Sequence, residues 1–374
     1  MKTLSSIACN LDADILLAAL PLLEAEKVQA IEWSFDTLYK FREVPPWFTE
    51  LLQAFGQADR LIGHGVFFSL FSGKWSTAQQ DWLNQLTQLS KTFRFDHITE
   101  HFGFMTGADF HAGAPISLPF TPVTLAIGTD RLRRIYDACQ CPVGLENLAF
   151  SYSLDEVKKH GDFLFRLIEP INGFIILDLH NLYCQSHNFG LEPDALLQLY
   201  PLDRVREIHI SGGSWEDSPL LPSRPIRRDT HDDSVPAAVF QMLEYALGQC
   251  PNVKFVVMEQ LGAGLKTETS RRQFQADFET MDAILRQQES STQPTNAFLP
   301  AGRIELGQPL EDELLHRQQR QLSDILEQAS GCTDAQRLLS ASELAHTAWG
   351  VEKWEPYMLE TALRIAQKWK KGFS

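Results

Sequence analysis

The sequence predicts an α/β protein with a (β/α)8 barrel and a small helical region after it. Short β-rich segments alternate with amphipathic stretches of helical spacing over the first 290 residues, and this alternation is typical of parallel βα units. Eight such pairs fit this length, which favours a closed barrel over an open doubly wound sheet. The 374 residues, 44% of them hydrophobic, also suffice for a large core plus an appendage.

Eight strands and eight helices are expected in alternation. The strands are expected at residues 5–9, 30–35, 60–66, 96–101, 143–147, 174–180, 207–211 and 255–260. The helices are expected at residues 14–26, 46–56, 77–92, 124–140, 154–168, 192–200, 237–249 and 268–288. This predicts a catalytic, metal-binding barrel over residues 1–289. The stretch 290–302 has the Ser, Thr and Pro content of a linker, and residues 303–374 form an appendage with helices at 310–329, 335–347 and 353–371.

Charge and cysteine usage narrow the class of protein. The chain has 33 Lys and Arg against 48 Asp and Glu, a net charge of −15, which disfavours a nucleic-acid backbone as partner. The apolar run at residues 15–23 is too short to span a bilayer and lacks a cationic flank, so we expect a cytoplasmic protein without a membrane partner. Six cysteines without a C-x-x-C pair argue against a disulfide framework and against a thiolate zinc site.

Histidines and carboxylates recur where the expected strands end. In a (β/α)8 barrel these ends converge on one rim, so the residues would surround a single cavity. Ligation by imidazole and carboxylate without thiolate suits iron, manganese or zinc, and the number of ligands suits two or three ions. Residues two apart share a face of a strand, so Asp178 would lie beside His180, and Asp229 beside His231 if that loop is extended. The whole series is His64, Glu100, His101, Glu146, Asp178, His180, His209, Asp229, His231 and Glu259.

A structural interpretation exists for each of these residues. A single strand-end histidine is more often a hydrogen-bonded structural group than a ligand, and Arg131, Arg133 and Arg206 are available to pair with buried carboxylates. Asp178, however, lies in the apolar run F-I-I-L-D-L, where an unpaired carboxylate would be costly. Six consecutive strands that end in ligand-type side chains favour a metal centre over six separate structural roles.

Nine short motifs occur in the order found in one known family. They are H-G-V at 64–66, T-E-H at 99–101, P-F-T at 119–121, L-E-N at 145–147, L-D-L-H-N-x-Y at 177–183, N-x-G at 188–190, E-I-H at 207–209, D-T-H at 229–231 and M-E at 258–259. With them the chain resembles, over about residues 1–288, the multinuclear non-heme iron-dependent oxidases, which include the methanobactin maturation oxidase.

The resemblance implies a xylose-isomerase-like TIM barrel with two or three iron ions, Fe2+ or Fe3+. With O2 as co-substrate, the iron would modify cysteine or another residue of a ribosomally synthesised precursor peptide, and a separate recognition protein could take part. The implied metal ligands are His64, His101, Glu146, Asp178, His209, Asp229, His231 and Glu259. From its position beside Asp178 we expect His180 to be a further ligand. Glu146, Asp178 and His180 would be catalytic, and Glu100, Asn147 and Asn181 would orient ligands. Arg224, Arg227 and Arg228, in the long segment 212–236, would attract an acidic peptide or form a solvated basic loop.

The chain departs from the family pattern at three places. His180 stands where the family has asparagine, and Ser211-Gly212-Gly213 replaces its A-G-H. The family's N-H-G is Asn188-Phe189-Gly190 here, with His187 just before it. We therefore expect the ligation of one ion to be rearranged, with His180 or His187 as possible replacements.

Two other functions remain open at this point. The same barrel and ligand series also resembles endonuclease IV, a three-zinc phosphodiesterase of damaged DNA, although the chain lacks a basic stripe interleaved with aromatic residues. A barrel with a degenerate centre could instead bind a peptide in a metal-dependent way without catalysis.

Overall fold

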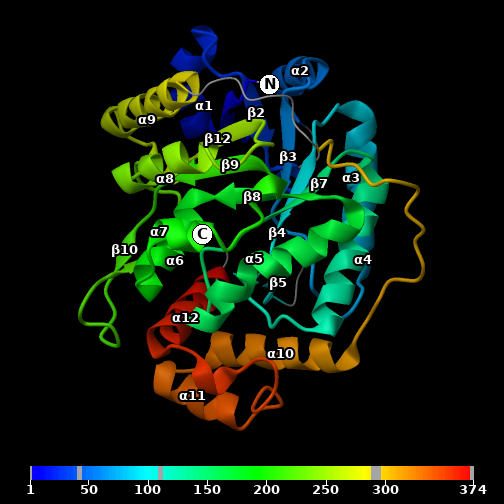
Figure 1. The fold of residues 1–374 in the computed structure, drawn as a ribbon, viewed down its shortest axis with the longest axis vertical. Coiled ribbons are helices and arrows are strands. Elements are labelled where there is room, and N and C mark those ends of the chain that lie inside the picture. Colours follow the sequence, from blue (N-terminus) through cyan, green and yellow to red (C-terminus); the bar gives the residue numbers. More distant parts are fainter. Residues whose placement is uncertain (1, 40–43, 108–112, 288–295, 371–374) are drawn as a thin grey trace.

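The computed structural model describes residues 2–39, 44–107, 113–287 and 296–370, and it contains a closed barrel of parallel strands in the order β1-β12-β9-β8-β7-β4-β3-β2 (Figure 1). The predicted fold class is confirmed. The barrel strands are β1 (Leu4–Ala8), β2 (Ala30–Trp33), β3 (Leu61–Gly65), β4 (Ile98–His101), β7 (Val143–Glu146), β8 (Phe174–Asp178), β9 (Val205–Ser211) and β12 (Phe255–Glu259). Two short hairpins, β5 (Phe104–Met105) with β6 (Pro115–Ile116) and β10 (Trp215–Glu216) with β11 (Ile226–Arg227), follow β4 and β9.

Helices surround the barrel and continue after it. They are α1 (Ala13–Glu24), α2 (Pro46–Gln57), α3 (Thr77–Thr92), α4 (Pro122–Cys139), α5 (Leu154–Ile168), α6 (Leu179–Phe189), α7 (Pro193–Leu197), α8 (Ala237–Leu247), α9 (Glu268–Gln287), α10 (Glu313–Gln328), α11 (Cys332–Ser340) and α12 (Pro356–Lys370). Single turns of 3-10 helix occur at Phe35–Leu38, Glu169–Ile171, Leu202–Arg204, Gly262–Gly264 and Val351–Lys353.

Helix α6 corrects one expectation. The strand predicted to run through residue 180 ends at Asp178, because the Asp178 carboxylate accepts a hydrogen bond from the Asn181 backbone N–H and caps a helix. Gly190, with φ of 66°, ends this helix in the left-handed conformation that glycine adopts without strain. His180 therefore lies on α6 and does not share a strand face with Asp178.

Alternation along the strands divides the barrel interior into layers. Ala30, Ile62, Phe255 and Val257 form a buried apolar cluster inside the barrel. The residues two positions further along these strands point to the same side, toward the carboxyl end. They include Glu32, His64 and Glu259, so polar groups lie directly above the apolar layer.

The strand register sets which ligand-type residues become neighbours. His101 on β4 pairs with Glu146 on β7, and Asp178 on β8 pairs with His209 on β9. Neighbouring parallel strands lie about 4.8 Å apart, so these pairs can share a bound ion.

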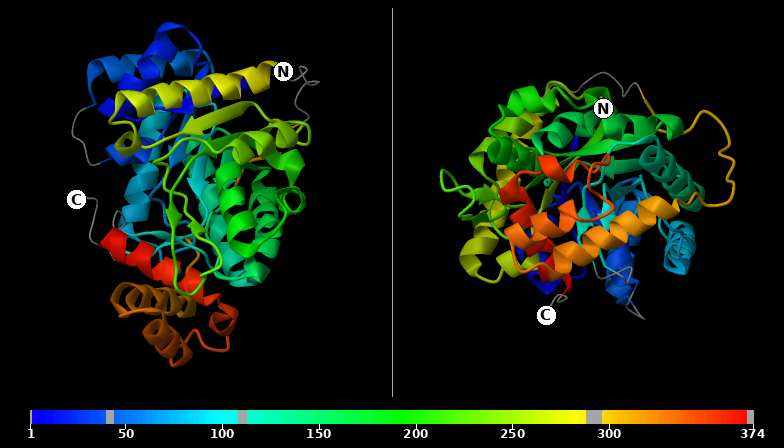
Figure 2. Two further views of the ribbon diagram at one scale, coloured as in Figure 1. Left: turned by 90° about the vertical axis from the view of Figure 1, so that its left-hand side faces the viewer. Right: turned by 90° about the horizontal axis from the view of Figure 1, so that it is seen from below.

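The C-terminal helices lie against the carboxyl end of the barrel (Figure 2). The ring of Trp354 stacks on Tyr152, after β7, with centroids 3.7 Å apart. On α10, the Gln319 side chain donates to the Phe71 carbonyl at 2.7 Å, after β3. On α12, the Tyr357 hydroxyl donates to the carbonyl of Asn188, on α6, at 3.0 Å. The helices thus cover loops on the side of the barrel where the candidate ligands gather.

The segment between barrel and C-terminal helices crosses the outside of the barrel, where Figure 1 shows it beside α4. Residues 290–295 of the expected linker lie outside the described residues. Asn296 exchanges hydrogen bonds with Asn172, and Phe298 is fully buried against Phe174. Further on, the Leu310 carbonyl accepts a hydrogen bond from Arg131 at 2.7 Å. The described part of the linker is therefore anchored to the barrel at Asn296 and Phe298.

No helix among the described residues is both long and apolar enough to cross a membrane.

Candidate metal centre

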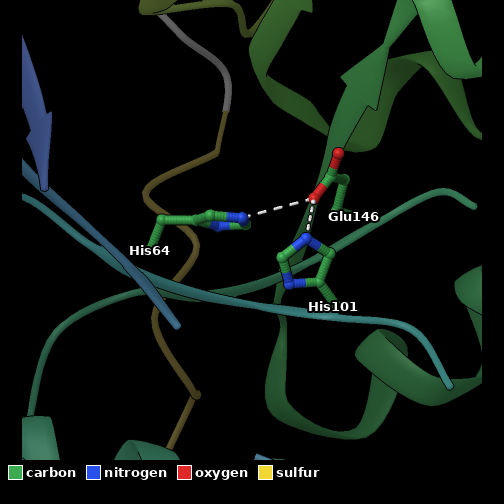
Figure 3. Close-up of side chains that lie close together, drawn as sticks. All are labelled: His64, His101 and Glu146. Carbon is green, nitrogen blue, oxygen red and sulfur yellow. Dashed lines mark ion pairs between the residues drawn. The ribbon is translucent and has the colours of Figure 1, made fainter. Parts of the chain in front are cut away.

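Two histidines converge on one oxygen of Glu146. The Nε2 atoms of His64 and His101 lie 3.3 Å and 3.2 Å from Glu146 Oε2 (Figure 3). The second ring nitrogens are engaged elsewhere: His64 Nδ1 lies 2.7 Å from the hydroxyl of Thr99, and His101 Nδ1 donates to the Gly65 carbonyl at 3.1 Å. Such bonds fix a ring with its free nitrogen facing the cluster, which is typical of metal-bound histidine.

A second group of ligands shares Glu146 with the first. Asp178, His209 and Glu259 join Glu146 with all four ligand atoms within 4.8 Å of one another. His209 Nδ1 lies 3.2 Å from Glu259 Oε2. Burial, then the nearby carboxylates of Asp229, Glu146 and Glu259, raise the pKa of Asp178 well above its usual range. A cation would relieve this crowding of buried carboxylates, so the residues fit a metal ion.

Two asparagines hold Glu146 and Asp178 in place, Asn181 through their carboxylates and Asn147 through the Asp178 backbone. Asn181 donates from Nδ2 to Glu146 Oε1 at 3.2 Å, and its backbone N–H donates to Asp178 Oδ1 at 2.6 Å. Asn147 accepts from the Asp178 backbone N–H at 2.7 Å and donates to the Asp178 carbonyl at 3.1 Å. Glu146 Oε2 faces only the two histidine nitrogens, and Asp178 Oδ2 has no hydrogen-bond partner among the described residues. One oxygen of each carboxylate is thus held, and the other stays available to an ion.

A third group lies deeper in the barrel and was missed by the sequence reasoning. His209 Nε2 is 3.1 Å from Glu32 Oε2 and 3.3 Å from Glu207 Oε1, and all three residues are fully buried. The group could hold an ion, or its carboxylates could orient the His209 ring toward the rim. Their spacing could have revealed them, because residues two apart on a strand share a face. Glu207 lies two residues before His209, and Glu32 lies two residues after Ala30.

The electrostatics of these groups are coupled. Burial raises the pKa of Glu32 to about 7, against the opposing effect of His209. Burial alone would lower the pKa of His64, but Glu32 and Glu146 outweigh it and raise that pKa to about 10. Without a metal, the His64 ring is therefore protonated at both nitrogens at neutral pH. The Nε2 proton must be lost when that nitrogen binds an ion.

Asp229 and His231 lie beside these groups. Asp229 Oδ1 is 2.9 Å from His231 Nε2 and 2.9 Å from His180 Nδ1, and His231 Nδ1 is 3.7 Å from Glu259 Oε2. His231 has φ of 51°, so the loop is not extended at this residue and the condition for a shared strand face is not met, although the two side chains still meet. The other nitrogen of His180 accepts a hydrogen bond from Arg227 Nε at 3.0 Å. His180 belongs to none of the three groups that could hold an ion within the described residues.

Comparisons with known proteins identify the family of the chain. Residues 28–261 match the family of RiPP precursor modification enzymes MbnB/TglH/ChrH. The chain belongs to this family. A UPF0276 protein of Caulobacter vibrioides is 27% identical over 188 residues, 50% of this chain and 64% of the relative. A UPF0276 protein of Acaryochloris marina is 29% identical over 187 residues, 49% of this chain and 64% of the relative. The chain thus spans less than two thirds of these relatives.

A solved structure shows the same fold. The IOLI protein with a bound zinc atom superposes with a TM-score of 0.50 at 14% identity and covers 78% of this chain and 100% of that chain. At this identity the likeness concerns the fold alone, a xylose-isomerase-like TIM barrel.

The remaining expected site residues of this MbnB/TglH/ChrH family member have protein partners. Glu100 is fully buried, and its Oε1 accepts from the His101 backbone N–H at 3.3 Å. Arg224 donates to the Asn188 carbonyl at 2.8 Å, and Arg228 forms an ion pair with Glu216. His187, the other possible replacement ligand, has its Nε2 2.9 Å from the Pro225 carbonyl, which directs it to the 212–236 segment rather than to the cluster.

Proposed function

We propose that this family member is a multinuclear, iron-dependent oxidase that uses O2 to modify a residue, most simply cysteine, of a ribosomally synthesised precursor peptide. One observation carries the proposal: the buried Glu146 carboxylate belongs to two adjoining ligand groups. A carboxylate placed in this way can bridge two ions, and ligands without thiolate suit iron.

The proposed ligands follow the groups. His64, His101 and Glu146 would hold one ion, and Glu146, Asp178, His209 and Glu259 the other. Bound iron would supply Lewis acidity toward a substrate thiol and the redox capacity to use O2. Glu146 and Asp178 would be the central catalytic carboxylates.

The chain itself supplies orientation and a dry site. The proposed ligands are buried except at His101, whose side chain is 26% exposed. His101 and the neighbouring Asp229 and His231, each 22% exposed, would mark the side from which a substrate can enter. Asn181 bonds to Glu146 Oε1 and Asp178 Oδ1, so the other oxygen of each carboxylate would be oriented toward the ions.

Metal content and oxygen dependence test the proposal. Protein purified without oxygen should contain more than one iron per chain, and it should change the mass of a short cysteine-containing peptide encoded beside its gene only when O2 is admitted. A Glu146→Gln variant serves as the inactive control. An equal mass change under strict anaerobiosis would refute the oxidase.

The alternative functions predict other results. Zinc alone together with cleavage of abasic DNA would assign an endonuclease-like reaction. Peptide binding without any mass change in the iron-loaded, aerated protein would assign a binding protein.

A further inference from the structure

Arg227, on β11, is buried without a carboxylate partner among the described residues. We propose that its guanidinium binds a carboxylate of the peptide substrate and makes the chain specific for a peptide with a negative charge close to the residue that is modified. The inference rests on the proposed function, because it names a chemical feature of that peptide.

The other buried arginines show how unusual this is within the chain. In the described ranges the buried arginines are Arg131, Arg134, Arg206 and Arg227. The first two form ion pairs with Asp130, and Arg206 forms one with Asp96. Within the same ranges the Arg227 guanidinium forms no ion pair, although a buried charge is costly unless it is paired. An anion brought by a ligand would pair it.

The hydrogen bonds of Arg227 leave one edge of its guanidinium open. Its Nε donates to His180 Nε2 at 3.0 Å. Its backbone N–H donates to Asn188 Oδ1 at 2.8 Å and its carbonyl accepts from Asn188 Nδ2 at 2.9 Å, so the residue is fixed at both ends. The two Nη groups donate to no acceptor in the described part of the chain. Two N–H groups side by side match the two oxygens of a carboxylate.

Two aromatic rings hold the guanidinium and connect it with the surface. Its central carbon lies 4.8 Å from the ring centre of Trp215 and 5.7 Å from that of Tyr183. Packing against ring faces leaves the N–H groups at the edge of the guanidinium free to donate. Trp215 is 47% exposed, whereas Arg227 is 3% exposed. A ligand can therefore reach this corner along Trp215 and bind the arginine in a setting that screens its charge poorly.

The nearby carboxylates of the chain already have partners. Glu216 forms ion pairs with Arg228 and with Arg364, on α12. A guanidinium can only donate, so His180 Nε2 accepts from Arg227 and the ring proton lies on Nδ1. His180 Nδ1 lies 2.9 Å from Asp229 Oδ1 and donates to it. These carboxylates therefore compete little with a carboxylate from a ligand.

The open edge lies close to the metal centre. One imidazole, that of His180, separates Arg227 from Asp229, and Asp229 and His231 are each 22% exposed at the proposed entry side. An extended peptide advances about 3.3 Å per residue. The recognised carboxylate would therefore belong to a residue within a few positions of the one that is modified.

Binding of three short probe peptides tests the inference. All are blocked at the amino terminus and contain one cysteine. The first has Asp two residues after the cysteine and an amidated end, the second has Asn instead of Asp, and the third has a free C-terminal carboxylate at that point. Calorimetric titration of the Fe2+-loaded, full-length chain without oxygen measures each dissociation constant. We expect the first or the third peptide to bind at least about tenfold tighter than the second, and the tighter one identifies the source of the carboxylate.

Variants link this preference to the guanidinium, each compared at equal iron content. Arg227→Met should reduce the preference to less than about twofold. Arg227→Lys should lower it, because lysine keeps the charge but loses the paired N–H groups. Arg228→Met is the matched control and should leave the preference unchanged, because Glu216 keeps Arg364 as a partner.

The results that would overturn the inference are distinct from those that would refute the proposed function. A wild-type chain that binds the three peptides equally, or binds none of them, overturns it, and so does a full preference in folded Arg227→Met or Arg227→Lys. If Arg227→Met fails to fold, the wild type and Arg227→Lys decide. Carboxylate-dependent binding without any oxidation after O2 is admitted would refute only the proposed function.

Discussion

Replacing Glu146 by glutamine should remove more than one metal ion from the chain. Glu146 contributes to a group of three ligands and to a group of four, so its loss leaves two and three. Removal of a group that only orients a ligand commonly weakens metal affinity ten- to a hundredfold. Removal of a ligand shared by two ions should therefore lower the affinity for each ion at least about a hundredfold. That is about 2.7 kcal/mol for each ion and about 5 kcal/mol for the pair.

Glu100→Gln is the matched control, because Glu100 is equally buried but bonds to the His101 backbone instead of facing the cluster. Both variants and the wild type are loaded with Fe2+ without oxygen, and iron per chain is measured after gel filtration. We expect fewer than one ion in Glu146→Gln and a nearly full complement with a reduced reaction rate in Glu100→Gln. Equal metal loss in the two variants, or full retention in Glu146→Gln, would refute the shared-ligand argument. Thermal melting of each metal-free variant verifies that the fold is intact.

Three further predictions concern Asn181, the buried Glu156 in the first turn of α5, and the C-terminal helices. Asn181→Ala should weaken iron binding ten- to a hundredfold, measured by competition with a chelator, because Glu146 Oε1 and Asp178 Oδ1 lose their donor; unchanged affinity would contradict that role. Burial raises the pKa of Glu156 to about 7, so its protonated form stabilises the fold below pH 4.5, and this contribution is lost as pH rises through 7. Glu156→Gln should therefore raise the unfolding free energy by about 1–2 kcal/mol at pH 8 but not at pH 4. An equal gain at both pH values would disprove the argument. Removing residues 303–374 would expose Tyr152, which is 1% exposed beneath Trp354. Calorimetry should therefore show a melting temperature lower by about 10 °C or more. An unchanged transition would support separable domains.

Most of the fold was predictable from local pattern. The eight strands were expected within two residues of their observed ends, because strand length and alternation are local properties. Helix α6 (Leu179–Phe189) was missed, because the apolar run continued past Asp178 and hid a helix cap. Asp178 and Asn181, three residues apart, have the spacing of a helix N-cap, but the apolar run F-I-I-L-D-L favoured a continuing strand.

From local pattern alone it follows that imidazole and carboxylate side chains gather on one rim, because parallel strands in a closed barrel end on the same side. Which of these side chains become neighbours depends on contacts between distant strands. The register of β4 against β7 brings His101 to Glu146, and that of β8 against β9 brings Asp178 to His209. The tertiary structure also decided that His180 bonds to Arg227 and that the C-terminal helices cover the rim. These contacts join residues far apart in the chain, and local periodicity carries no information about the distance between them.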